Sequence, residues 1–219
     1  MLNKTTIVIL FIVQLTVLST AHATLTQIQS PPGSESSVTD ILNAYAPSLS
    51  LTRIDDGKDI IWGIGPDTST SIRVIGKQAG FNNEVGFLSY ANGAVSYFYS
   101  LKVFSNDIFG DPITVITANS FGDELLLAIL TPQLNIFTSM PMQNTDSLDH
   151  MVTWVDNNDP FHYFVAFEDL LDGGDGDYND IVLELNNFVD GAPIPNPPTL
   201  ALLGVGLIGF AAFRRKVSQ

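Results

Sequence analysis

The sequence predicts an all-β protein whose main domain, residues 49–189, is an antiparallel, jelly-roll-like β-sandwich. In this region apolar residues come in short runs that are rich in β-branched and aromatic types, and Gly, Asn, Asp and Pro separate the runs. Residues 161–168 alternate clearly, so that Phe161, Tyr163 and Val165 share one face of a strand. No long segment has the 3.6-residue period of an amphipathic helix, which argues against a helical or α/β fold.

The predicted strands follow one another at short intervals and are bounded by turn-forming residues. They span residues 59–64, 71–75, 85–90, 95–104, 113–118, 124–130, 134–138, 151–155, 161–168 and 181–188. Because short turns favour antiparallel neighbours, this series predicts two packed antiparallel sheets.

A short helix is the one departure from this pattern. Residues 24–48 form a leader before the sandwich, and within it Val38, Ile41, Leu42 and Tyr45 recur at helical spacing. We therefore predict a helix between residues 37 and 45.

The first 23 residues have the layout of a secretory signal peptide. Lys4 precedes an apolar run over residues 7–18, and Ala21, His22 and Ala23 supply the small residues of a cleavage site. The sequence therefore predicts an exported protein.

The C-terminal end predicts a short transmembrane helix. A proline-rich linker, residues 190–198, leads into fifteen uncharged residues, 199–213, and three basic residues follow at 214–216. Basic residues stay on the cytoplasmic side of a membrane, so residues 199–219 would anchor the domain transiently to the outer face of the inner membrane.

The charge is strongly negative. The chain has 9 basic and 23 acidic residues and a net charge of −14. Removing Lys4 and the three basic residues of the tail leaves 5 basic against 23 acidic residues. Such a surface repels nucleic acid and attracts divalent cations. The chain has no Cys, which excludes disulfides and thiol chemistry.

The densest acidic segment is EDLLDGGDGDYND, residues 168–180, which lies between two predicted strands. Its glycines allow a tight fold that brings side chains together, and carboxylates with an Asn amide are ligands that Ca²⁺ prefers. Its D-x-D-x-N start resembles an EF-hand loop, but Asp180 and Asn186 stand where that loop needs Gly and Glu. We therefore predict a calcium site in a sandwich end-loop, with these candidate ligands: Glu168, Asp169, Asp172, Asp175, Asp177, Asn179 and Asp180.

Two alternatives remain for this loop. Glu168 with Asp180 or Asp177 would supply the paired carboxylates of a carbohydrate-active hydrolase, although a chain so poor in other catalytic groups favours a protein that is not an enzyme. In the second alternative Asp and Asn only cap turns and bind no ion. A second acidic turn, residues 156–159, would join the site if both lie at one end of the sandwich. Trp62, Trp154 and the aromatic residues 97–99 raise the question of sugar stacking.

Two segments resemble known bacterial families. FVAFEDLLDGGDGDYNDIVLEL resembles the signature of the domain of unknown function DUF4114, which we place at about residues 100–189. The earlier GKQAGFNNEVGFLSY resembles the segment that often precedes this signature in exported members of the family. The tail resembles a PEP-CTERM sorting signal, although Asn196 stands where the motif has Glu. The resemblance to the sorting signal implies an exosortase-like partner and a place in the Gram-negative envelope, on its outer surface or in the extracellular matrix. We expect a structural or adhesive role with exopolysaccharide or surface proteins as candidate partners.

Overall fold

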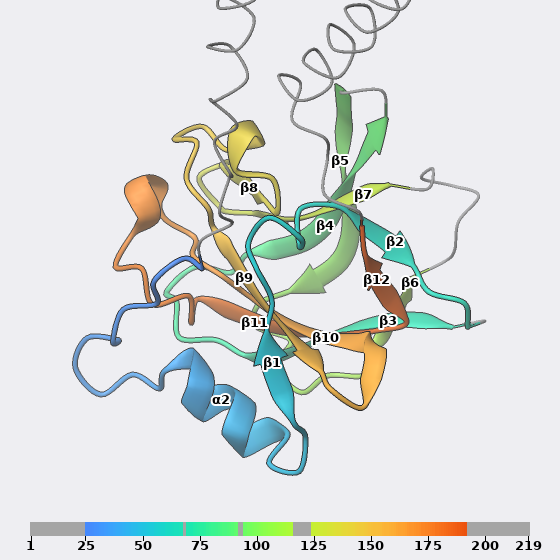
Figure 1. The fold of residues 1–219 in the computed structure, drawn as a ribbon. Helices are drawn as coiled ribbons and strands as arrows, with labels where there is room; N and C mark the ends of the chain where they lie inside the picture. The colour runs from blue at the N-terminus through green and yellow to red at the C-terminus, as the bar shows by residue number, and fades with distance from the viewer. Residues whose placement is uncertain (1–24, 68, 92–93, 116–123, 192–219) are drawn as a thin grey trace, which may run out of the picture.

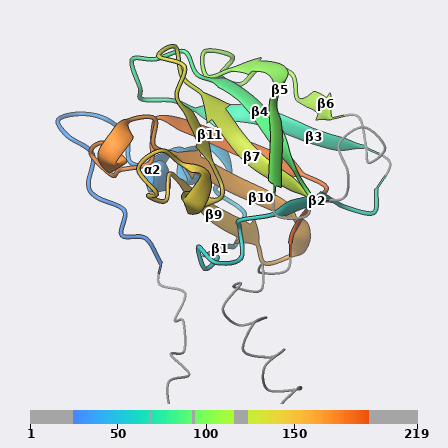
Figure 2. The ribbon, with the colours of Figure 1, turned by 90° about the horizontal axis from the view of Figure 1, so that it is seen from above.

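The computed structural model describes residues 25–67, 69–91, 94–115 and 124–191. These residues form two antiparallel sheets packed face to face, with one α-helix against the outside of the first sheet (Figures 1 and 2). The prediction of an all-β antiparallel sandwich is confirmed. The predicted signal peptide and the predicted transmembrane helix lie outside the described residues. Within the described part of the chain, no helix is both long and apolar enough to cross a membrane.

The first sheet holds the acidic loop. Its strand order is β1-β9-β10-β11-β3-β6. The strands are β1 (Leu51–Arg53), β9 (Met151–Asp156), β10 (Asp159–Phe167), β11 (Ile181–Asn186), β3 (Thr70–Gly76) and β6 (Ile113–Val115). β10 and β11 pair over six register positions, which end at Phe167 opposite Ile181. Residues 168–180 therefore leave one central strand and return in its neighbour.

The second sheet has the order β12-β2-β7-β4-β5, and β8 also pairs with β7. Its strands are β12 (Phe188–Asp190), β2 (Trp62–Ile64), β7 (Leu125–Leu130), β4 (Glu84–Ala91), β5 (Ala94–Phe104) and β8 (Ile136–Thr138). The predicted strand over 181–188 is two strands, because Asn187 adopts a φ of 61° and the chain passes there from the first sheet to the second. The amide of Asn187 holds this crossing, since its Nδ2 donates to the Asp67 carbonyl and to Thr70 Oγ1.

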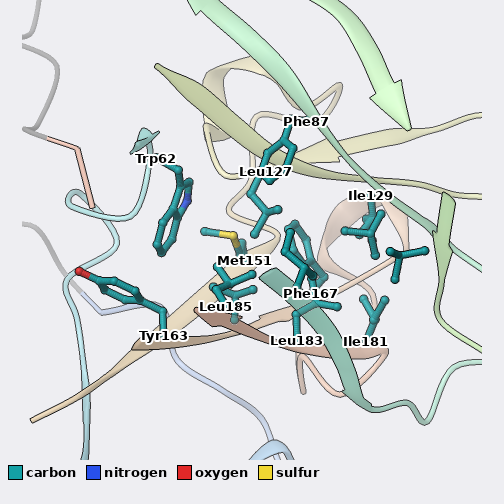
Figure 3. Packing of buried hydrophobic residues seen from close by; sticks show 14 of the residues in the cluster. Trp62, Phe87, Leu127, Ile129, Met151, Tyr163, Phe167, Ile181, Leu183 and Leu185 are labelled. Atoms are coloured by element: carbon teal, nitrogen blue, oxygen red, sulfur yellow. The ribbon is translucent and has the colours of Figure 1, made fainter. Parts of the chain in front are cut away.

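The main core lies between the sheets. In Figure 3, Trp62, Phe87, Leu127 and Ile129 of the second sheet face side chains of the first sheet, among them Phe167. Alternation along the strands supplies this layer, as the sequence indicates for residues 161–168. Burying this apolar surface is the main stabilising contribution available to a chain without disulfides.

The predicted helix is present as α2 (Val38–Tyr45). Ser37 caps its N-terminus in a capping box, in which Asp40 N–H donates to Ser37 Oγ and Ser37 N–H donates to the Asp40 carboxylate. The helix buries Val38, Ile41 and Leu42 in a second apolar cluster on the outer face of the first sheet. Both faces of the sheet behind the acidic loop are thus covered, so the loop has a rigid base.

Candidate metal centre

The acidic loop, residues 168–180, is held in a compact shape by left-handed backbone conformations. Gly173, Gly174 and Gly176 have φ values of 76°, 49° and 71°, and Asp172 and Tyr178 also have positive φ. Asp172 and Gly173 belong to a short 3₁₀ turn, η2 (Leu171–Gly173). Because glycine adopts positive φ without a steric cost, these positions fold the loop back on itself.

Three carboxylates converge at the base of the loop, and we call Glu168, Asp169 and Asp180 the inner cluster. One carboxylate oxygen from each lies within 4.8 Å of the other two. Glu168 and Asp169 are only 1% and 3% exposed. Asp169 N–H donates to Asp180 Oδ2 at 2.8 Å, and Gly176 N–H donates to Glu168 Oε2 at 3.1 Å. The loop backbone thus aims these carboxylates at a shared point.

Asn83 is a fourth member of this neighbourhood that the sequence analysis did not single out. It is fully buried, and its Nδ2 donates to Asp169 Oδ2 at 2.6 Å across 86 residues of sequence. Ser105 Oγ accepts from Asn83 N–H at 2.9 Å and fixes the residue from behind. The resemblance to DUF4114 drew attention to the segment GFNNEVGFLSY, but nothing in that segment alone connects Asn83 with the acidic loop.

Two buried oxygen atoms at this site have no hydrogen-bond donor in the described residues. They are Glu168 Oε1 and Asn83 Oδ1. A buried carboxylate oxygen without a donor is costly unless a proton or a cation satisfies it. A Cβ added at Gly174 would lie 1.9 Å from Glu168 Oε1, so only glycine permits this approach of the loop to the carboxylate.

Burial and mutual repulsion raise the pKa values of the inner cluster. Burial, and then the charge of Asp180, raises the pKa of Glu168 to about 9. Burial, and then the charge of Asp169, raises the pKa of Asp180 to about 7. The pKa of Asp169 is also raised by burial. At neutral pH Glu168 therefore keeps a proton unless a cation takes the place of that proton.

A second group, which we call the outer cluster, lies nearer the surface. It consists of Glu35, Asp175 and Asp177, whose carboxylate oxygens also lie within 4.8 Å of one another. Glu35 and Asp175 are exposed, and Asp177 is buried. Asn179 donates from N–H and Nδ2 to the Asp177 carboxylate at 3.0 and 2.7 Å, so the amide of Asn179 braces a turn. Glu35 comes from the leader, where nothing in the sequence marked it as a ligand.

The leader lies side by side with the acidic loop, as the blue and orange segments of Figure 1 show. Gln29 N–H donates to the Gly176 carbonyl at 2.9 Å, and Asn179 Nδ2 donates to the Ser36 carbonyl at 3.1 Å. The loop therefore has contacts on two sides, from its own sheet and from the leader.

The predicted ligands thus divide into three sets. Glu168, Asp169 and Asp180 form the inner cluster, and Asp175 and Asp177 belong to the outer cluster. Asn179 braces Asp177. Asp172 belongs to neither cluster; it is exposed, and its N–H donates to Asp146 Oδ2 at 2.8 Å.

His150 supports the start of the loop. Its ring is fully buried and stacks on Phe137 with 4.0 Å between ring centroids. Nδ1 lies 3.0 Å from the carbonyl oxygen of Glu168, and Nε2 lies 2.9 Å from Asp146 Oδ2. Both neighbours are acceptors, so the ring links the backbone of Glu168 to the loop before β9 and has no access to a substrate.

The other candidate features lie elsewhere. The acidic turn over residues 156–159 joins β9 to β10 and stands at the opposite end of β10 from the acidic loop, so the two do not form one site. Trp62 is fully buried in the core, whereas Trp154 is partly buried beneath Arg53. His162 forms a hydrogen bond in the first sheet, with its Nε2 3.0 Å from Glu184 Oε1.

Two segments of the chain match models of known families. Residues 80–187 match the model of DUF4114, a domain of unknown function. The match covers just under half of the chain. Asn83, the inner cluster, Asp175 and Asp177 all fall inside the matched range, whereas Glu35 precedes it. The resemblance to DUF4114 is confirmed, although the match begins at residue 80 and not at about residue 100, and the matched range contains every residue of the inner cluster.

Residues 193–216 match the PEP-CTERM protein-sorting motif, which confirms the second resemblance. The matched range includes Asn196, so the sequence matches the motif despite the Asn at that position. The motif implies an exported protein of the Gram-negative envelope that an exosortase processes. No curated protein matches the chain.

Proposed function

We propose that the DUF4114 domain binds Ca²⁺ at the inner cluster and that the protein acts as a structural or adhesive component of the cell surface or extracellular matrix. The observation that carries the proposal is Glu168 Oε1, a buried carboxylate oxygen that has no donor among the described residues and lies near two further carboxylates. A divalent cation would neutralise the cluster and supply the missing partner.

The donor set favours calcium among the divalent cations. The side chains of Glu168, Asp169, Asp180 and Asn83 offer oxygen ligands at this cluster. The chain has no Cys, and the ring of the neighbouring His150 is fully buried and lies against the Glu168 carbonyl and Asp146. Zinc prefers nitrogen and sulfur ligands, whereas calcium takes six to eight oxygens in flexible geometry. Bound calcium would lock the loop against the first sheet and present a rigid surface at that end of the sandwich.

The geometry does not favour the hydrolase alternative. Glu168 is 1% exposed, and one of its carboxylate oxygens lies within 4.8 Å of a carboxylate oxygen of Asp180. The carboxyls of glycoside hydrolases stand about 5 Å or more apart and flank a bond of the substrate. A pair this close suits one shared proton or cation, and a buried Glu168 does not reach a glycosidic oxygen.

The test is a calcium titration of the purified full-length protein, followed by thermal melting. At calcium about 100 times the dissociation constant, binding stabilises the folded state by about 2.7 kcal/mol. For a domain of this size that raises the melting temperature by roughly 5 to 10 °C. Asp180→Asn should abolish most of this gain, because it removes one charged ligand and keeps the acceptor for Asp169 N–H.

Asp172→Asn is the matched control. It makes the same chemical change in the same loop, at a side chain outside both clusters. It should keep the full rise in melting temperature that calcium produces, which we call the calcium gain. A wild-type protein whose melting temperature is the same in calcium and in chelator would refute the proposed site.

A further inference from the structure

One member of the inner cluster, Asp169, lines a pocket. The pocket has a volume of about 520 Å³, within the range of small-ligand sites. The acidic loop forms one wall, and the loops before β4 and before β8 form the others. Its lining includes Phe81, Gln133, Asn135, Asp169, Leu171 and Gly174. Gly174, which lines the pocket, lies close to Glu168 Oε1, since a Cβ added there would stand 1.9 Å from that oxygen.

The pocket walls contain one aromatic ring and two side-chain amides that make no hydrogen bond to another described residue. Phe81 is partly exposed, and Leu170 and Leu171 are 46% and 42% exposed. The side chains of Gln133 and Asn135 make no hydrogen bond to any other described residue. Amides in this state offer both donors and acceptors to a ligand, and an apolar ring offers a flat contact surface.

Calcium at the inner cluster would keep open coordination positions. Ca²⁺ takes six to eight oxygens, and four side chains, Glu168, Asp169, Asp180 and Asn83, stand at the cluster. Some of their oxygens already accept hydrogen bonds, from the loop backbone or from Asn83. Part of the calcium coordination shell is therefore left for external oxygen atoms. Asp169 lines the pocket, which places these positions on the pocket side.

We propose that this pocket binds a neutral sugar unit through the calcium ion. Two adjacent hydroxyls of the sugar complete the coordination of calcium, Gln133 and Asn135 hydrogen-bond to further hydroxyls, and Phe81 packs against the ring. The pocket lining includes two carboxylates, Asp169 and Asp175, and no Lys or Arg, which disfavours an anionic ligand. This inference rests on the proposed calcium site, since without the ion the carboxylates would repel one another.

The experiment is saturation-transfer NMR on the full-length protein with methyl mannoside, methyl galactoside and methyl fucoside, each in calcium and in chelator. We expect binding of at least one glycoside in calcium and none in chelator. The double variant Gln133→Ala/Asn135→Ala should weaken that binding about tenfold, the loss expected for two modest hydrogen bonds. It should keep the calcium gain in melting temperature, because neither residue touches the inner cluster.

Gln143→Ala is the matched control, since Gln143 is an exposed amide outside the pocket. If calcium raises the melting temperature but no glycoside binds, the sugar proposal is wrong while the calcium site stands. If a glycoside binds equally in chelator, or if only an acidic sugar such as methyl galacturonoside binds, the proposed mode of binding is wrong. A failure of calcium to raise the melting temperature would instead remove the site on which this inference rests.

Discussion

Two acidic segments flank β10, and they differ in what their carboxylates contact. In the turn over residues 156–159, Asp156 Oδ1 accepts from Asn158 N–H at 3.0 Å, and Asp159 Oδ1 accepts from Phe161 N–H at 3.0 Å. These are turn-capping bonds of the kind that Asp and Asn make throughout proteins. In the acidic loop, by contrast, Glu168 Oε1 is buried with no donor in the part of the chain that the structure describes, and three carboxylates converge.

The difference shows that burial and convergence, not the number of acids, distinguish a candidate cation site. Asp159 is exposed, whereas Glu168 is 1% exposed and must share a proton or bind a cation. The glycines of the acidic loop create this state, because they let the backbone close over the carboxylates.

The largest effect is expected from Gly174→Ala. The new Cβ would lie 1.9 Å from Glu168 Oε1, and alanine at a φ of 49° is strained. The backbone term costs about 1–2 kcal/mol, and displacing a buried carboxylate adds a similar amount, so we expect a loss of about 3 kcal/mol in the free energy of unfolding. Calcium should then give little or no gain. Chemical denaturation with and without calcium measures both the loss in the free energy of unfolding and the remaining stabilisation by calcium.

Gly33→Ala separates the two causes. Gly33 has a φ of 66°, and its added Cβ would meet no atom within 4 Å. This variant should show the backbone cost alone and keep the calcium gain. If Gly174→Ala behaves in the same way as Gly33→Ala, the close approach to Glu168 does not matter for binding.

The second effect is a dependence of stability on pH in the metal-free protein. The pKa of Glu168 is raised from 4.5 to about 9 on folding, so between these values the folded state binds more protons than the unfolded state. The free energy of unfolding therefore falls as the pH rises from about 5 to 9. We expect the metal-free melting temperature to fall by several degrees over that range, and the calcium gain to grow, because calcium competes with the proton.

Glu168→Gln tests the origin of this trend. The neutral amide removes the titrating group, so the metal-free protein should lose much of its pH dependence and melt higher than the wild type at pH 8. The same variant should lose the calcium gain. A wild-type melting temperature that rises between pH 6 and 8 in chelator would contradict the raised pKa.

The smallest effect is expected at the other end of β10. Asp159→Asn keeps the acceptor for Phe161 N–H, and the side chain is exposed. It should change the free energy of unfolding by less than about 0.5 kcal/mol and leave the calcium gain intact. A calcium gain that falls with this variant would mean that the two acidic segments do act together, against the separation seen in the fold.

Part of this separation was already available in the sequence. Residues 161–168 were predicted as one strand between the two acidic segments, and a strand of eight residues or more spans about 25 Å. Its two ends cannot share an ion. The predicted strand over 181–188 was harder to correct, because Asn187 breaks it through contacts with Asp67 and Thr70, which lie 120 and 117 residues away.

The sequence by itself determined the features that depend on neighbouring residues. Alternation set the strands, the spacing of Val38, Ile41 and Leu42 set the helix, and the run of acids and glycines marked the loop. Only the tertiary structure decided which oxygens meet. Asn83 reaches Asp169 across 86 residues, and Glu35 reaches the loop from the leader. Local periodicity carries no information about such contacts, since they arise from how the sheets and the leader pack. That packing leaves Glu168 Oε1 buried with no donor among the described residues.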